Sequence, residues 1–258
     1  MTGVKKTYER DGVKVTEFGC SNGATSEYIL ASSNSTVDPV QLRAALQNMR
    51  GKQGGMHDEP NSPGRGSVQR FTMGPLQLIA RQYRRGGLVA RVATKSYLWT
   101  GLKRSRAFRE LKVLDFLTRK DVSVCTPEAA WVVRHGPGYQ ASLLTHYVPN
   151  STTLGQQFAN NELTEQTLRD VGRLVRQMHD QSVYHADLNA HNILCSSEGL
   201  VLIDFDRGAV RADSGAWMQN NLQRLKRSFE KLATLHNVSL SEQNWQTLIN
   251  AYESGSGP

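Results

Sequence analysis

The sequence predicts an α+β protein whose first half is rich in strands and whose second half is mostly helical. Two observations support this order. Short apolar runs separated by glycine and proline turns dominate the chain before Pro149, and a long amphipathic helical pattern follows it. At 258 residues, with 38% hydrophobic and 21% charged residues, the chain can bury a substantial core, as one domain or as two joined lobes.

The N-terminal region predicts strands followed by one helix. Residues 1–36 mix polar residues with short apolar runs such as Glu27–Leu30, which indicate one or two edge strands. Asp38 and Pro39 then supply an N-cap and a proline at the first helical position. We expect the helix that they begin to end at Gly51, before a loop rich in Gly, Pro, Asn and Ser.

A β-hairpin is predicted after this loop. Ser67–Thr72 and Leu76–Tyr83 are strand-like runs, and Met73-Gly74-Pro75 between them is a good turn. The next predicted element is a helix that carries Glu110. Its apolar residues recur at helical spacing: Ala107, Leu111 and Leu114.

A second pair of strands and a long helix follow. Pro127 begins an extended segment, and Gly136-Pro137-Gly138 turns the chain back into the run Ala141–Val148. The amphipathic helix beyond it is marked by its apolar positions: Leu168, Val171, Val175 and Met178.

The densest pattern in the chain is the segment HADLNAHNIL, which begins at His185, and the segment LVLIDFD, which follows after a short turn. Two short apolar strands therefore flank a tight turn, and each carries a polar residue at its edge. Asp187 begins the loop, Asn192 lies five residues later, and Asp204 ends the second strand.

These three side chains fit the chemistry of phosphoryl transfer. That reaction needs a carboxylate that accepts the proton of the attacking hydroxyl, and hard oxygen ligands that hold Mg²⁺ on the phosphates of ATP. Asp187 fits the first role as catalytic base, and Asn192 and Asp204 fit the second. Each residue alone also fits a structural turn. All three in this order, with the H-x-D-x-x-x-x-N spacing of protein kinases, favour the catalytic interpretation.

The pattern predicts a bilobal protein-kinase-like fold, with a sheet-rich N-lobe over residues 1–145 and a mostly helical C-lobe over residues 146–258. The N-lobe is expected to bind the nucleotide, with the hinge within Leu144–Val148. At the start of the first hairpin, Gly64-Arg65-Gly66 would let backbone amides approach the phosphates, although the run lacks the third glycine of the fuller kinase motif.

Two residues compete for the role of the cation that binds the α- and β-phosphates. Lys95 ends Val92-Ala93-Thr94-Lys95, which matches the Val-Ala-x-Lys of kinases, but it lies beyond a Gly-Gly turn. Arg81 lies on the strand paired with the glycine-containing hairpin. We therefore favour Arg81, with Glu110 on the following helix as its ion-pair partner, although an ordinary surface arginine remains the alternative.

The chain departs from protein kinases in two ways that indicate a small acceptor. Asn189 stands where protein kinases usually carry a substrate-loop lysine. After Asp206 the chain runs only to Pro258, which is too short for an activation segment and a large peptide-binding subdomain.

Positive charge is concentrated in one part of the chain. Residues 81–120 contain twelve Lys and Arg residues but only two acidic ones, whereas the whole chain has a net charge of +8. A solvated helix face is the simpler interpretation. Concentration on this scale favours an anionic partner such as a phosphate-rich ligand, a membrane surface or a nucleic acid.

Four segments together resemble the 3-deoxy-D-manno-octulosonic acid (Kdo) kinase family. They are HADLNAHNIL from His185, IDFDRG from Ile203, QYRRGGLVA from Gln82 and YLWTGL from Tyr97. The resemblance runs from about Gly64 to Gly208.

This resemblance implies a kinase of lipopolysaccharide core biosynthesis, with ATP and Mg²⁺ as cofactors. The implied acceptor is the 4-hydroxyl of a Kdo sugar on lipid A precursor. It also implies a peripheral position on the anionic, cytoplasmic face of a Gram-negative inner membrane, and no nucleic-acid partner is expected. The basic segment agrees with this.

Two alternatives stay open. One is a soluble small-molecule kinase resembling aminoglycoside or choline kinases, although such enzymes generally carry acid-lined acceptor sites. The other is a non-catalytic, basic kinase-fold binding protein, for which an intact set of catalytic residues would be unnecessary.

Composition favours the cytoplasm. The N-terminus has no apolar stretch after its lysines, and no apolar run approaches the roughly 18 residues of a spanning helix. The three cysteines have neither disulfide nor zinc spacing, which is typical of a reducing compartment: Cys20, Cys125 and Cys195.

Overall fold

The computed structural model of the chain describes residues 3–19, 25–51, 68–83, 96–212 and 215–255. The chain divides into two compact units. Unit 1 comprises Met1–Asp115 and Thr126–Tyr147, and unit 2 comprises Phe116–Cys125 and Val148–Pro258.

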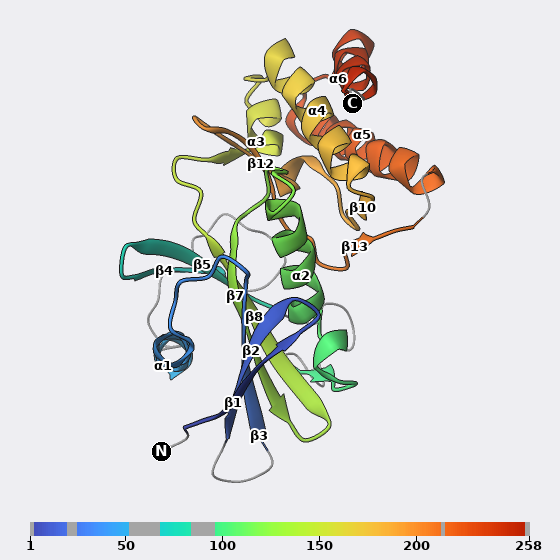
Figure 1. Cartoon of the computed structure of the whole chain (residues 1–258). Coiled ribbons are helices and arrows are strands. Elements are labelled where there is room, and N and C mark those ends of the chain that lie inside the picture. Colours follow the sequence, from blue (N-terminus) through green and yellow to red (C-terminus); the bar gives the residue numbers. More distant parts are fainter. Residues whose placement is uncertain (1–2, 20–24, 52–67, 84–95, 213–214, 256–258) are drawn as a thin grey trace. The chain divides into compact units, whose positions relative to one another are not determined.

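Unit 1 is built on one antiparallel sheet, in which the described residues form eight strands (Figure 1). The strands are β1 (Val4–Arg10), β2 (Val13–Gly19), β3 (Thr25–Ala31), β4 (Val68–Met73), β5 (Leu76–Gln82), β6 (Tyr97–Leu98), β7 (Pro127–His135) and β8 (Gly138–His146). Their order is β1-β2-β3-β7-β8-β5-β4, and the short β6 also pairs with β8. The β4–β5 and β7–β8 hairpins lie where the glycine and proline turns predicted them.

The expectation of one or two edge strands before residue 36 is wrong. That region forms three strands, and β3 lies inside the sheet because it pairs with β7 from Thr25↔His135 to Ala31↔Ala129. The β1–β2 hairpin turns at Asp11 and Gly12, whose φ angles are 51° and 79°. Asp-Gly is a favoured pair for a two-residue hairpin turn, and here it joins two strands in a polar stretch of sequence.

Helix α1 (Pro39–Gly51) begins and ends where the sequence predicts. The side chain of Asp38 accepts a hydrogen bond from the Val40 amide at 3.0 Å, which caps the first turn. The apolar face of α1 belongs to the core of unit 1, where Leu42 and Leu46 are buried together with Phe18, Ile29, Leu78 and Leu144.

Helix α2 (Arg106–Thr118) follows a short 3-10 turn, η2 (Leu102–Arg104). The hydroxyl of Ser105 accepts a hydrogen bond from the Phe108 amide at 3.3 Å, as an N-cap does. Later in the helix, Asp115 accepts two 2.7 Å bonds from the amide and hydroxyl of Ser33. These contacts fix the helix that carries Glu110.

Unit 2 is mostly helical. Its helices are α3 (Leu154–Ala159), α4 (Glu165–Asp180), α5 (Ala216–His236) and α6 (Glu242–Ser254). Helices α4 and α6 pack closely, because a Cβ atom on Gly172 would lie only 2.3 Å from the Leu248 carbonyl oxygen. In the parts of the chain that the structure describes, no helix is both long enough and apolar enough to cross a bilayer.

Two small sheets in unit 2 surround the predicted catalytic loop. One pairs β10 (Val183–Tyr184) with β13 (Ala209–Val210). The other joins β9 (Thr152–Thr153), β11 (Ile193–Ser196) and β12 (Gly199–Leu202). The loop therefore leaves one sheet at Tyr184 and enters the other at Ile193.

Candidate active site

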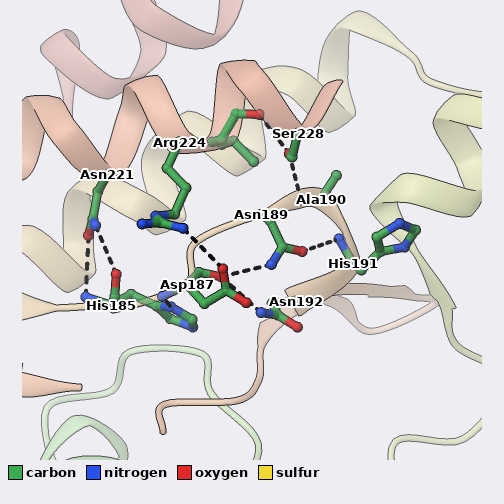
Figure 2. A network of polar contacts seen from close by, with 10 residues as sticks. His185, Asp187, Asn189, Ala190, His191, Asn192, Asn221, Arg224 and Ser228 are labelled. Atoms are coloured by element: carbon green, nitrogen blue, oxygen red, sulfur yellow. Dashed lines mark hydrogen bonds and ion pairs between the residues drawn. The ribbon is translucent and has the colours of Figure 1, made fainter. Parts of the chain in front are cut away.

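The predicted catalytic loop in unit 2 folds around the backbone carbonyl of Asp187 (Figure 2). The side-chain amide of Asn189 donates to this oxygen at 2.9 Å, and that of Asn192 donates at 2.8 Å. The other end of the Asn189 amide accepts from the His191 amide at 2.9 Å, which caps the short helix η3 (Ala190–Asn192). The asparagines thus determine the local shape that presents the Asp187 side chain.

His185 holds the start of this loop and is completely buried. Its Nδ1 accepts a hydrogen bond from the Asp187 amide at 3.1 Å, since a backbone amide can only donate. Its Nε2 must then carry the proton, and it lies 3.0 Å from the Ile203 carbonyl oxygen. Burial lowers the pKa of His185, which is consistent with a neutral ring that both contacts require.

The backbone brings Asp204 next to Asn192. The Ile203 amide donates to the Asn192 carbonyl at 3.0 Å, so Asp204 follows directly after this contact. Asp204 has a φ of 61°, an uncommon conformation for a residue other than glycine. Because Nδ2 of Asn192 bonds to Asp187, its Oδ1 is the atom that the amide can offer to a cation.

The donor set suits Mg²⁺ rather than a metal in an all-protein cage. Asn192 and Asp204 would supply an amide oxygen and a carboxylate, both hard ligands. Among the described residues, no group of three or more His, Cys, Asp and Glu side chains is arranged to hold a metal. Mg²⁺ generally takes one or two protein ligands and completes its shell with phosphate and water, so these two residues fit it.

Three residues of helix α5 contact the loop, and the sequence patterns did not predict them (Figure 2). The amide of Asn221 contacts the His185 backbone twice, donating to its carbonyl at 2.8 Å and accepting from its amide at 3.3 Å. Arg224 Nη1 lies 3.3 Å from Asp187 Oδ1. The Ser228 hydroxyl accepts from the Ala190 amide at 3.0 Å. Their spacing of three and four residues places them on one helical face, which was the available signal.

Asn221 also connects the loop to helices α4 and α6. Its Oδ1 lies 3.2 Å from Nε2 of His179, and Nδ1 of His179 lies 2.9 Å from the Tyr252 hydroxyl. The amide oxygen can only accept, so Nε2 carries the proton and Tyr252 donates to Nδ1. Burial lowers the pKa of His179 to about 4. A neutral histidine therefore joins both helices to the catalytic loop.

In unit 1, Arg81 on β5 and Glu110 on α2 form an ion pair with a 2.5 Å separation between Nη2 and Oε1. Glu110 is 1% exposed and also accepts a 2.6 Å hydrogen bond from the Tyr83 hydroxyl. Burial, together with the Glu110 carboxylate, raises the pKa of Tyr83 well above its usual range, so this hydroxyl stays protonated as a donor. The Glu110 carboxylate is thus held by two partners, one on β5 and the other directly after it.

The other predicted nucleotide contacts lie outside the described residues. These are Gly64, Arg65 and Gly66, together with the competing cation Lys95. Within unit 2 the structure brings Asp187, Asn192 and Asp204 into one loop system, and within unit 1 it pairs Arg81 with Glu110. The choice between Arg81 and Lys95 as phosphate ligand therefore stays a prediction.

Known proteins match this chain over most of its length. The sequence profile of the lipopolysaccharide kinase (Kdo/WaaP) family matches residues 47–252. A 3-deoxy-D-manno-octulosonic acid kinase of Vibrio cholerae is 37% identical over 194 residues, which cover 75% of this chain and 82% of that protein. A kinase of the same name from Xanthomonas campestris pv. campestris is 40% identical over 176 residues, covering 68% and 70%.

A solved structure supports the fold. The chain resembles WaaP, solved in complex with acyl carrier protein, with a TM-score of 0.56 and 17% sequence identity over 88% of each chain. The predicted kinase-like α+β fold, sheet-rich in its N-terminal region and helical in its C-terminal region, is thereby confirmed. On the profile match and the identity to its relatives, the chain is a kinase that belongs to the lipopolysaccharide kinase (Kdo/WaaP) family.

Proposed function

We propose that this protein uses ATP to phosphorylate the 4-hydroxyl of a Kdo sugar on lipid A precursor, in the biosynthesis of the lipopolysaccharide core. The observation that carries the proposal is the way the loop holds Asp187. Two asparagine side chains donate to the Asp187 carbonyl, and His185 accepts from the Asp187 amide. Relatives named as Kdo kinases supply the acceptor class.

Asp187 acts as the general base. Its carboxylate takes the proton of the 4-hydroxyl while the sugar oxygen forms a bond to the γ-phosphorus of ATP. The bond from that phosphorus to the bridging oxygen breaks, and ADP leaves with the electron pair. The backbone contacts of Asp187 orient its side chain before the acceptor arrives, which lowers the entropic part of the barrier.

Asn192 and Asp204 are the residues that would hold Mg²⁺, through the amide Oδ1 and the carboxylate. The ion would neutralise charge on the β- and γ-phosphates. The contact between the Asn192 carbonyl and the Ile203 amide supports this role, because it keeps both ligands in adjacent backbone positions.

The nucleotide is proposed to bind in the N-lobe predicted over residues 1–145, most of which belongs to unit 1, whereas residues 116–125 belong to unit 2. The catalytic loop lies in the C-lobe predicted over residues 146–258. Arg81 would bind the α- and β-phosphates while Glu110 holds its guanidinium in place. Gly64-Arg65-Gly66 would contribute backbone amides to the phosphates.

The protein is proposed to work as a peripheral protein on the anionic cytoplasmic face of the inner membrane, where a lipid-linked acceptor lies. Exposed Leu98 and the exposed basic residues Lys103 and Arg104 of unit 1 support this location. No nucleic acid is needed as a partner.

A transfer assay with radiolabelled ATP tests the function. We expect label to reach Kdo-bearing lipid A precursor and not an aminoglycoside panel or choline. Asp187→Asn should lower kcat by at least a hundredfold, up to about 10⁴-fold, with nucleotide binding nearly intact. Transfer to an aminoglycoside in preference to Kdo would favour the soluble kinase alternative. Salt-sensitive RNA or DNA retention without ATP turnover would instead favour the non-catalytic alternative.

A further inference from the structure

We propose that Arg224 recognises the carboxylate of the acceptor sugar and thereby selects a sugar acid over a neutral sugar. The inference rests on the proposed function and names a specificity-determining residue for it. Arg224 lies on helix α5, which the sequence patterns did not connect with catalysis.

The position of Arg224 is fixed by its neighbours on the same helical face. One turn earlier, Asn221 is 1% exposed and holds the His185 backbone; one turn later, Ser228 holds the Ala190 amide. Both neighbours bind main-chain atoms of the catalytic loop. Arg224, between them, contacts a side chain instead, the carboxylate of Asp187. Helix α5 is therefore anchored to the loop on both sides of the arginine.

The geometry of the ion pair leaves Arg224 able to meet a ligand. Its Nη1 lies 3.3 Å from Asp187 Oδ1, longer than an ideal charge-assisted hydrogen bond. The side chain of Arg224 is 45% exposed and that of Asp187 is 28% exposed, so the pair faces solvent. A guanidinium has five N–H donors in a planar fork, which suits a second, bidentate carboxylate partner.

The chemistry of the acceptor supplies such a partner. An octulosonic acid carries a carboxylate at C1, and the oxygen of its 4-hydroxyl is four bonds from that carbon (C1–C2–C3–C4–O4), about 5 Å away by ordinary bond lengths. With the 4-hydroxyl hydrogen-bonded to Asp187, the two carboxylates would lie close enough to repel each other. A guanidinium that contacts one of them can bind the other and offset that repulsion.

Two other roles for Arg224 make different predictions. An arginine that only orients Asp187 would affect every acceptor in the same proportion. An arginine that stabilises the transferring phosphoryl group would do so too. Of the three roles, only recognition of the acceptor carboxylate predicts that the loss of activity in an Arg224 variant depends on whether the acceptor carries that charge.

The experiment is a double-mutant-type cycle that combines a change of Arg224 with a change of the Kdo carboxylate. Kdo-bearing lipid A precursor is prepared with the Kdo carboxylate free or as its methyl ester, and kcat/KM is measured for each. In the wild-type protein the free acid should be preferred about 10- to 100-fold, the range for a hydrogen bond to a charged group. In Arg224→Gln the ratio of acid to ester should fall close to one. Arg224→Lys should give an intermediate ratio, because it keeps the charge without the fork.

Arg227→Gln is the matched control. Arg227 lies on the same helix and is exposed, so this variant removes the same charge and should keep the wild-type ratio. An Arg224→Gln protein that retains the wild-type ratio while losing activity on both acceptors would overturn the inference and leave the proposed function standing. A wild-type protein that phosphorylates neither acceptor would overturn the proposed function, and the inference with it. Melting curves of each variant establish that the variants are folded.

Discussion

At the scale of single residues, several atoms in the site can only donate or only accept a hydrogen bond, and this determines the role of the atom that each one contacts. The Asp187 amide donates to His185, so the histidine must be neutral with its proton on Nε2. Asn192 donates to the Asp187 carbonyl, so its oxygen is left for a cation. The sequence predicted these residues because their spacing is distinctive, but spacing alone does not indicate which atom of each side chain meets which partner.

Mutation can distinguish the roles of the two proposed metal ligands. Asp204→Ala removes a charged ligand, so we expect Mg²⁺-dependent nucleotide binding to be lost. Asn192→Ala removes a neutral ligand, so binding should weaken and the Mg²⁺ concentration for half-maximal binding should rise. Titration of each variant with Mg²⁺ and a non-hydrolysable ATP analogue measures both effects. Wild-type metal dependence in Asp204→Ala would contradict the ligand role.

The phosphate-binding cation is a second test at this scale. Arg81 lies beside buried Glu110, whereas Lys95 lies outside the described residues. Arg81→Ala should raise the KM for ATP by at least about tenfold, the effect of losing one charge-assisted hydrogen bond, and by far more than Lys95→Ala does. Steady-state kinetics at saturating acceptor measures both values. The reverse ranking would assign the role to Lys95.

At the scale of elements, patterning predicted those whose apolar residues point to one face. Helices α1, α2 and α4 and both predicted hairpins lie where spacing placed them. Strand β1 was missed because nearly all its residues are exposed, so no alternation marks it. The contribution of α5 was missed because Asn221 is a buried polar residue whose partners lie far away in sequence. Tertiary hydrogen bonds of this kind leave no local pattern.

The hydrogen bonds from α4 and α6 through His179 to Asn221 make the stability of unit 2 depend on pH. The pKa of His179 is lowered from 6.5 to about 4 by burial, so the folded state resists protonation. Well above pH 6.5 this histidine is neutral in both the folded and the unfolded chain, so its shifted pKa does not lower the free energy of unfolding. As the pH falls from 6.5 towards 4, the unfolded chain binds a proton that the folded chain does not, and the free energy of unfolding falls by up to about 3 kcal/mol.

Urea denaturation followed by circular dichroism between pH 7.5 and 4.5 measures this loss. His179→Gln removes the titrating group and retains an amide donor and acceptor, so its free energy of unfolding should vary less with pH than that of the wild type. The buried His185, whose pKa is also lowered, contributes in the same direction and stays present in both proteins. Parallel curves for the two proteins would show that His179 does not titrate in this way.

At the scale of the whole molecule, not every apolar side chain among the basic residues of the segment 96–106 is exposed to solvent. Tyr97, Leu98, Trp99 and Leu102 lie among these basic residues in the sequence, a mixture of aromatic, apolar and basic side chains that is typical of a surface that contacts a bilayer. Leu102 is a core residue, 5% exposed, and Trp99 stacks on Tyr28 with ring centroids 5.9 Å apart. Leu98 is 64% exposed. Sequence cannot separate such residues, because a short segment that leads from a strand into a helix presents one side to the core and the other to solvent.

The charges on this segment also differ from one another. Lys103 forms an exposed ion pair with Asp11 at 2.8 Å, and Arg106 donates to the Tyr97 hydroxyl at 2.7 Å. Arg104 is exposed. An exposed pair such as Lys103–Asp11 stabilises a fold little, so Lys103 can turn to an anionic surface at small cost. Leu98 would add apolar contact beside these charges.

Membrane binding should therefore depend on the basic residues of this segment and on the charge of the lipid. Basic residues near an anionic leaflet contribute about 1 kcal/mol each, so replacing Lys103, Arg104 and Arg106 by Gln should weaken binding to anionic vesicles by roughly 100-fold. Binding to neutral vesicles should not change, and high salt should reproduce the loss in the wild type. Liposome co-sedimentation over a range of lipid concentrations measures the affinities.

The matched control replaces three arginines of helix α4, Arg169, Arg173 and Arg176, which pair with acids on the same helix. This variant has the same change in net charge, so it separates a localised surface from a general attraction of a basic protein to anionic lipid. Equal loss in both triple variants would support only the general attraction. Equal binding by the first variant and the wild type, at low salt on anionic vesicles, would leave this segment with no part in membrane binding.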